Sequence, residues 1–97
     1  MSKKPIVTDG IAKKTADTLG LDLGKYPLKL WKFALNVELE HGRRSNLTNV
    51  TDDDMLKTSK IALAHIQEFP DYYQRLKIME QNAEKYWKKK EKPDLMK

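Results

Sequence analysis

Apolar residues recur every three or four positions in four stretches of the chain, the spacing that places them on one face of an α-helix. No stretch shows the alternation of apolar and polar residues that is typical of a half-buried β-strand. The four stretches cover residues 8–19, 27–41, 52–69 and about 70–88. The pattern therefore predicts an all-α fold, a compact bundle of three to four helices.

Residues with particular backbone preferences mark the ends of the first two helices. Thr8 or Asp9 suits the N-cap of the first helix, and Gly20 suits its C-terminal end. Pro27 fits the first position of the second helix because its φ is fixed and it has no N–H to satisfy. Gly42 is expected to end this helix. The second helix has the widest apolar arc, so it should be the most buried.

The third helix begins in an acidic sequence. Thr51 and Asp54 have the spacing of a capping box, with Thr51 as the N-cap. Asp52, Asp53 and Asp54 also place negative charge at the positive end of the helix dipole. Three aspartates could instead indicate a calcium loop, but the alternating spacing, the glycine and the closing glutamate of such a loop are missing. Capping is therefore the better interpretation.

Pro70 should separate the third helix from the fourth by a kink or a break, because proline clashes with the preceding turn. The fourth helix carries an apolar stripe that is expected to pack in the core: Tyr72 or Tyr73, Leu76, Met79, Ala83, and Tyr86 or Trp87. Beyond Lys88 the sequence is rich in lysine. We expect one domain over residues 1–97, with an ordered core over about 8–88 and a frayed basic tail over 89–97.

Composition excludes several classes of protein. The 97 residues include no cysteine, which rules out disulfides, thiolate zinc sites and a thiol nucleophile. No stretch approaches the ~20 apolar residues of a membrane span. Lys3 and Lys4 are followed by Pro5 and polar residues rather than by the apolar stretch of a signal peptide. These features predict a cytoplasmic protein with no membrane contact.

The net charge of +5 is concentrated at the two ends of the chain. Residues 1–29 and residues 84–97 each hold six lysines against three acidic residues, whereas residues 30–83 have a net charge of −1. Nucleic acid is one partner that these basic termini could bind, with Lys88, Lys89 and Lys90 contacting phosphates. Arginine, which supplies most base readout, is scarce, so solvation of the helix end is the simpler interpretation.

Each of the two histidines has a glutamate one helical turn away. Glu38 precedes His41, and Glu68 follows His65, in both cases by three residues, so each pair shares a helix face. If the second and third helices pack together, these four side chains could hold a zinc, iron or manganese ion. Acidic residues are so frequent here that such pairs also arise by chance. A buried histidine satisfied by a carboxylate is therefore the preferred interpretation.

Three segments of the chain resemble a family of small helical proteins of unknown function. The residues that carry the resemblance are Val37-Glu38-Leu39-Glu40-His41-Gly42, then Thr48-Asn49-Val50-Thr51-Asp52-Asp53, then residues 60–80, which include Ala64-His65-Ile66-Gln67-Glu68-Phe69-Pro70-Asp71-Tyr72-Tyr73. Members of that family occur in bacteriophages, large DNA viruses and bacteria. The resemblance covers about residues 20–84 and implies a phage or microbial setting, in a host cytoplasm or a virion. It implies no assigned enzymatic activity and transfers no catalytic residue.

The resemblance directs attention to a group of polar and aromatic residues: Glu38, Glu40, His41, His65, Glu68, Asp71, Tyr72 and Tyr73. The sequence favours a non-enzymatic structural or protein-interaction module, whose partner is another protein or a second copy. Tyr72, Tyr73 and Asp71 are the expected partner-binding residues, although Trp87 and one of the two tyrosines should pack in the core. Two alternatives stay open, a metal-binding bundle that uses the two His/Glu pairs and an accessory nucleic-acid binder that uses the lysine tail.

Overall fold

The computed structural model describes residues 7–43, 47 and 54–96, with the backbone alone for residues 41–43. These residues form four α-helices: α1 (Asp9–Leu19), α2 (Leu28–Arg43), α3 (Met55–Glu68) and α4 (Tyr72–Trp87). The described ranges contain no β-strand. The prediction of an all-α fold with four helices is confirmed.

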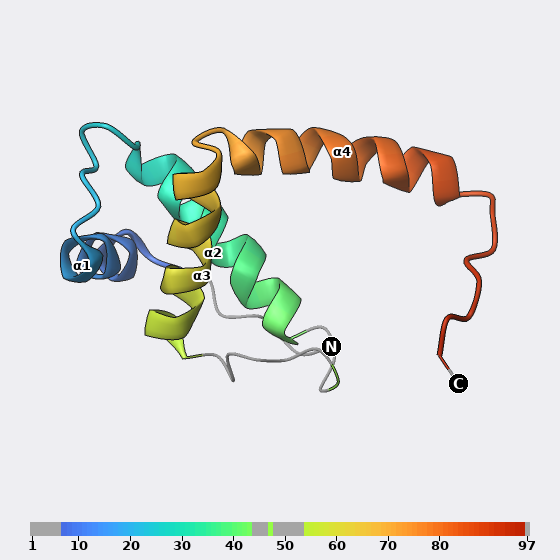
Figure 1. Ribbon diagram of the computed structural model, residues 1–97, viewed down its shortest axis with the longest axis horizontal. Helices are drawn as coiled ribbons and strands as arrows, with labels where there is room; N and C mark the ends of the chain where they lie inside the picture. Colours follow the sequence, from blue (N-terminus) through green and yellow to red (C-terminus); the bar gives the residue numbers. More distant parts are fainter. Residues whose placement is uncertain (1–6, 44–46, 48–53, 97) are drawn as a thin grey trace.

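Three of the helices form a bundle, and the fourth leaves it. The helices α2 and α3 make the most extensive contact, and α1 packs against both of them. The first turns of α4 lie against α2 and α3, and the rest of α4 extends away from the bundle to a free end (Figure 1). From α4, only Tyr72, Tyr73 and Leu76 join the hydrophobic core. The fold therefore consists of a packed part and a projecting helix.

The core of the bundle is centred on Trp31, whose side chain is fully buried. Its indole N–H points to α1, where the carbonyl oxygen of Ala12 and the hydroxyl of Thr15 lie 3.0 and 3.1 Å from Nε1. A buried indole needs such a partner because its N–H cannot reach water. Among the described helices, α2 supplies the most buried apolar residues, as its wide apolar arc predicts.

The ends of α1 are as predicted, whereas the predicted end of α2 and the predicted start of α3 were wrong. Thr8 caps α1 by accepting a hydrogen bond from the amide of Ile11, and Gly20 follows the helix with a φ of 77°. The helix α2 continues through Gly42 to Arg43, because one glycine weakens a helix by about 1 kcal/mol without interrupting its hydrogen bonds.

The start of α3 differs from the predicted capping box. Asp54 is the N-cap, and its carboxylate accepts a hydrogen bond from the amide of Lys57 at 3.0 Å, so the helix begins at Met55 rather than at Asp52. An aspartate at the N-cap reaches an amide of the first turn directly, which makes it one of the best residues for this position. Thr51, with Asp52 and Asp53, lies outside the described residues.

The helices α3 and α4 are separated at Pro70. The residue after α3, Phe69, has an extended backbone with φ −140° and ψ 110°, and α4 begins at Tyr72. Beyond that point the prediction of a core stripe along α4 was wrong for Met79 and Tyr86, which are 55% and 59% exposed. Trp87 is only half-buried and is not part of the core. The later turns of α4, which carry these residues, extend past the bundle (Figure 1).

Candidate functional site

Four polar and aromatic side chains from three helices meet where α4 begins. Glu38 comes from the middle of α2, His65 from the last turn of α3, and Tyr72 and Tyr73 from the first turn of α4. The short connection at Pro70 turns the chain sharply from α3 into α4 (Figure 1) and places these tyrosines beside the end of α3. We call Glu38, His65, Tyr72 and Tyr73 the Glu38 cluster.

The shortest polar contact of the cluster joins Tyr73 to Glu38. The hydroxyl of Tyr73 donates a hydrogen bond to Oε2 of Glu38 at 2.7 Å. Tyr73 is fully buried, and the side chain of Glu38 is 10% exposed. A carboxylate at this depth is costly unless a donor replaces the lost water, and the phenol supplies that donor. The hydrogen bond therefore ties α4 to α2.

The imidazole of His65 lies against the same carboxylate. Its Nε2 is 3.8 Å from Oε2 of Glu38, which is an ion pair only when the ring is protonated and is longer than a hydrogen bond. The ring stacks on Tyr72, with 4.2 Å between centroids and 4° between planes. It also meets Tyr73 edge to face at 6.2 Å. His65 thus joins α3 to both of the other helices, and its side chain remains 35% exposed.

The environment raises the pKa of the tyrosines in and near the cluster. For Tyr73, burial raises the pKa well above its ordinary value of about 10, and the hydrogen bond and charge of Glu38 raise it further. Burial is also the main cause of the raised pKa of Tyr72, followed by the charges of Glu38, Glu68 and Glu80. The pKa of Tyr26 is raised by burial alone. In each case the fold holds the neutral phenol more tightly than the unfolded chain does.

These raised pKa values predict a loss of stability in alkaline solution. Above pH 10 the unfolded chain releases the phenol proton of Tyr73, which the folded chain retains, so this residue lowers the free energy of unfolding by up to about 1.4 kcal/mol per pH unit. Tyr72 and Tyr26 act in the same direction. The stabilisation is complete below pH 10. Urea unfolding between pH 9 and 11 measures this slope, and Tyr73→Phe should make it shallower. The same substitution at exposed Tyr86 should leave it as in the parent protein; equal slopes for all three proteins would contradict the prediction.

The structure brings together some of the residues that the sequence singles out for a metal. Glu38 and His65 lie side by side, as described. The side chain of His41 lies outside the described residues. Glu68 is exposed and acts on the cluster through its charge near Tyr72. Within residues 7–40 and 54–96, no group of three or more histidine and acidic side chains is arranged to hold a metal ion.

The expected partner-binding residues differ in their accessibility. Tyr73 is fully buried, which confirms that one of the two tyrosines packs in the core and removes it from the surface. Tyr72 and Asp71 are half-buried, and the carboxylate of Asp71 accepts a hydrogen bond from Nε of Arg75 at 2.7 Å. Chemically, the Glu38 cluster is suited to holding three helices in one arrangement, because Glu38 and Tyr73 are largely enclosed and only His65 and Tyr72 are partly open.

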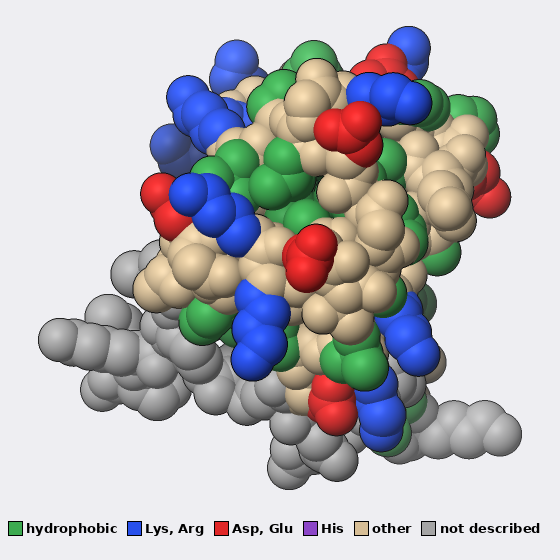
Figure 2. Space-filling view, turned by 90° about the vertical axis from the view of Figure 1, so that its left-hand side faces the viewer, with side chains coloured by type: hydrophobic (Ala, Val, Ile, Leu, Met, Phe, Trp, Pro, Cys, Tyr) green, Lys and Arg blue, Asp and Glu red, His purple; other side chains and the backbone are tan. Residues whose placement is uncertain are grey.

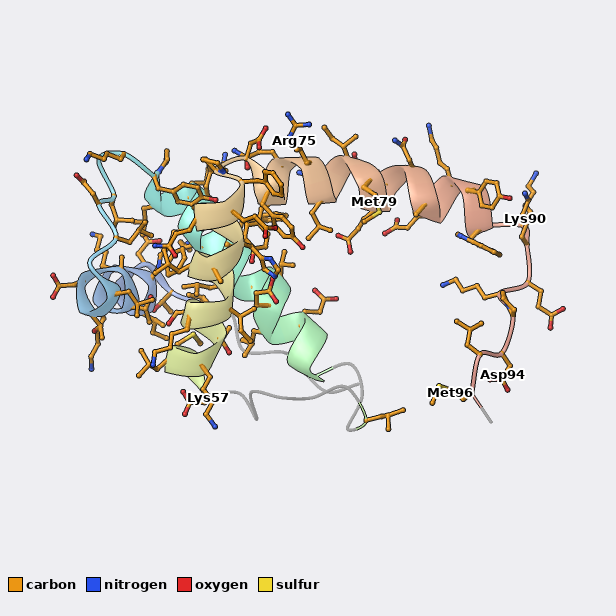
Figure 3. All side chains as sticks on the ribbon, viewed as in Figure 1. Lys57, Arg75, Met79, Lys90, Asp94 and Met96 are labelled. Carbon is orange, nitrogen blue, oxygen red and sulfur yellow. The ribbon has the colours of Figure 1, made fainter. Side chains whose placement is uncertain are left out.

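Sequence reasoning missed a second feature, the outward side of α4. Exposed residues that share one side of the helix, and Lys89 in the turn that follows it, form a stripe that we call the outer face: Arg75, Ile78, Met79, Asn82, Tyr86 and Lys89. Arg75, Met79 and Lys90 mark the course of the helix from the bundle to its free end (Figure 3). The sequence did contain a signal for this face, the length of the apolar stripe. A stripe along the sixteen residues of α4 is longer than the part of the helix that packs against the bundle.

Comparisons with known proteins assign the chain to a family but not to an activity. The model of a family described as "Protein of unknown function (DUF5661)" matches residues 12–82. Neither the curated proteins nor the solved structures gave a match. In the part of the chain that the structure describes, no helix is both long and apolar enough to cross a membrane.

Proposed function

Since the chain belongs to this family of unknown function, we propose its role from geometry: it is a non-enzymatic protein-interaction module whose docking element is α4. The observation that carries the proposal is the outer face, where Ile78, Met79 and Tyr86 are 60%, 55% and 59% exposed. Large apolar side chains gathered on one face of a projecting helix are typical of an interaction site rather than of a solvated helix.

The charge of the outer face indicates the kind of partner. Its charged residues are Arg75, which pairs with the carboxylate of Asp71 at 2.7 Å, and Lys89. The outer face has no acidic side chain that could pair with Lys89 of a second copy, which disfavours self-association through this face. An amphipathic helix that carries apolar residues and flanking Asp or Glu side chains complements both properties of the face. We therefore assign the occupant as an acidic amphipathic segment of a different protein.

A synthetic peptide tests this docking site. The probe is a 16-residue helix with leucine at every third or fourth position and glutamate elsewhere, and a scrambled peptide of the same composition is the reference. We expect the amphipathic peptide to bind and Met79→Asp to weaken it about tenfold, because a charge replaces a central apolar contact. Gln81→Asp adds the same charge on another side of the helix and should change the affinity less than about threefold.

Two results would overturn the docking proposal. Equal binding of the scrambled peptide would show that charge alone drives the contact. Dimers that dissociate on Met79→Asp, seen by light scattering at micromolar protein, would show that a second copy occupies the face instead.

A second candidate function, the metal-binding bundle, is favoured by the pairing of Glu38 with His65 across α2 and α3. Glu38, His41, His65 and Glu68 remain its proposed ligands, for zinc, iron or manganese. If this is correct, purified protein carries close to one metal per chain by elemental analysis, and His65→Ala releases it. Metal-free protein whose melting temperature does not change on chelation would exclude this function.

A further inference from the structure

The free end of α4 carries two adjacent aromatic residues among lysines. Tyr86 and Trp87 meet edge to face, with ring centroids 5.2 Å apart. The ammonium of Lys90 lies 3.5 Å from the centroid of the Tyr86 ring and covers one of its faces. The Tyr86 ring is therefore partly covered by Lys90, and the half-buried Trp87 is the last residue of α4, outside the core of the bundle (Figure 1).

An open hollow of about 720 Å³ adjoins Trp87. Its lining includes three lysines, Lys85, Lys88 and Lys92, and one acidic residue, Glu84. This volume lies within the range of sites that hold small organic ligands. We call it the Trp87 hollow. It combines an indole ring with a surplus of positive charge, which suits a ligand that has both an aromatic ring and an anionic group.

The C-terminal end of the chain, like the N-terminal end, carries a surplus of positive charge. Residues 84–97 hold six lysines against three acidic residues, and Lys88, Lys89 and Lys90 are consecutive and exposed. On the opposite end, where α1 lies, lysine and arginine side chains are interspersed with acidic ones (Figure 2). The three consecutive lysines therefore make the free end of α4 attractive to a polyanion.

We infer that the Trp87 hollow and the lysines around it form a binding site for single-stranded nucleic acid, beyond the protein-docking role of the outer face. An unpaired base stacks on the indole of Trp87, and the neighbouring phosphates contact Lys85, Lys88 and Lys92. Because no arginine lies among residues 76–97, bidentate reading of base edges is absent and binding tolerates different sequences.

Binding of a 12-nucleotide oligodeoxythymidine tests the site, with two readouts. Stacking should quench the emission of Trp87, whereas Trp31 is fully buried and does not respond. The affinity should fall about 20-fold between 50 and 200 mM salt if the three lysines each contact one phosphate, at a log–log slope of about −0.7 per contact. Trp87→Ala should weaken binding about 5- to 100-fold. Trp87→Phe should keep most of the affinity and abolish the quenching.

Two triple lysine variants of equal net charge distinguish binding at this site from a general effect of positive charge. Lys85→Gln, Lys88→Gln and Lys92→Gln together should make the salt slope about 2 less steep and weaken binding at 50 mM salt at least tenfold. A second triple variant, Lys14→Gln, Lys25→Gln and Lys29→Gln, removes the same charge from exposed positions elsewhere and should leave the affinity within about twofold. Circular dichroism checks that both variants fold.

Three outcomes would overturn the inference: no binding at 50 mM salt, equal losses for the two triple variants, or equally tight binding of a 12-residue oligoglutamate. The last outcome would identify the hollow as a site for acidic protein segments. Met79 does not line the hollow. Met79→Asp should therefore leave the binding of oligoglutamate to the hollow unchanged, whereas it should weaken the binding of a helix to the outer face.

Discussion

Replacing Trp31 with alanine should lower the free energy of unfolding by about 4 kcal/mol, the largest effect that we expect from a single substitution. The indole is fully buried and joins α2 to α1 through the carbonyl of Ala12 and the hydroxyl of Thr15. Alanine leaves a cavity and removes the indole donor that joins the two helices. For a small domain this is a large fraction of the total stability. Urea unfolding measures the loss, and Trp31→Phe, which fills most of the space, should cost about 1–3 kcal/mol.

The second tryptophan is the matched control for this prediction. Trp87→Ala makes the same chemical change in the half-buried residue at the free end of α4, outside the core. We expect a loss below about 1 kcal/mol, as for other substitutions outside a packed core. Similar losses at both tryptophans would contradict the division of the molecule into a packed bundle and a projecting helix.

Removing the hydroxyl of Tyr73 should have the second largest effect. Tyr73→Phe deletes the donor that lies 2.7 Å from Oε2 of Glu38 and leaves a carboxylate that is 10% exposed with one fewer partner. Hydrogen bonds to charged groups contribute about 1.5–3 kcal/mol, so we expect the free energy of unfolding at pH 7 to fall by about 2 kcal/mol. Chemical denaturation of the two proteins gives this difference.

A neighbouring tyrosine and a double-mutant cycle provide the controls. In the described part of the chain the hydroxyl of Tyr72 makes no hydrogen bond, so Tyr72→Phe should change stability by less than about 0.5 kcal/mol and keep the stacking on His65. In a Glu38→Gln background, Tyr73→Phe should cost about half as much, because the acceptor is no longer charged. Strictly additive losses would show that the two groups do not act on each other.

Local preferences were sufficient to predict the helices. The spacing of apolar residues, the cap at Thr8 and the break at Pro70 act within a few residues of where they occur, so they can be recognised without the fold. The errors at Gly42 and Asp54 concern the ends of helices. At the end of a helix, alternative boundaries differ little in free energy. Gly42 could end α2 or lie within it, and Asp54 could be the N-cap of α3 or lie in its first turn.

The candidate site was harder to predict because it depends on three helices. The pairing of Glu38 with His65 follows only if α2 and α3 pack together in one particular register. The hydrogen bond from Tyr73 requires in addition that the first turn of α4 lie against both helices, and Tyr72 and Tyr73 are alike in the sequence. The apolar stripe of α4 has the pattern of a buried face along its whole length. This periodicity alone does not indicate how many turns of α4 the bundle covers.

The projecting helix separates the residues that maintain the fold from those that face solvent. The buried members of α4 lie up to Leu76, and the exposed apolar residues Ile78, Met79 and Tyr86 follow it. Most binding surfaces are constrained because their residues also contribute to stability. Here the outer turns of α4 can accumulate neutral substitutions and acquire or lose affinities during evolution while the bundle stays intact.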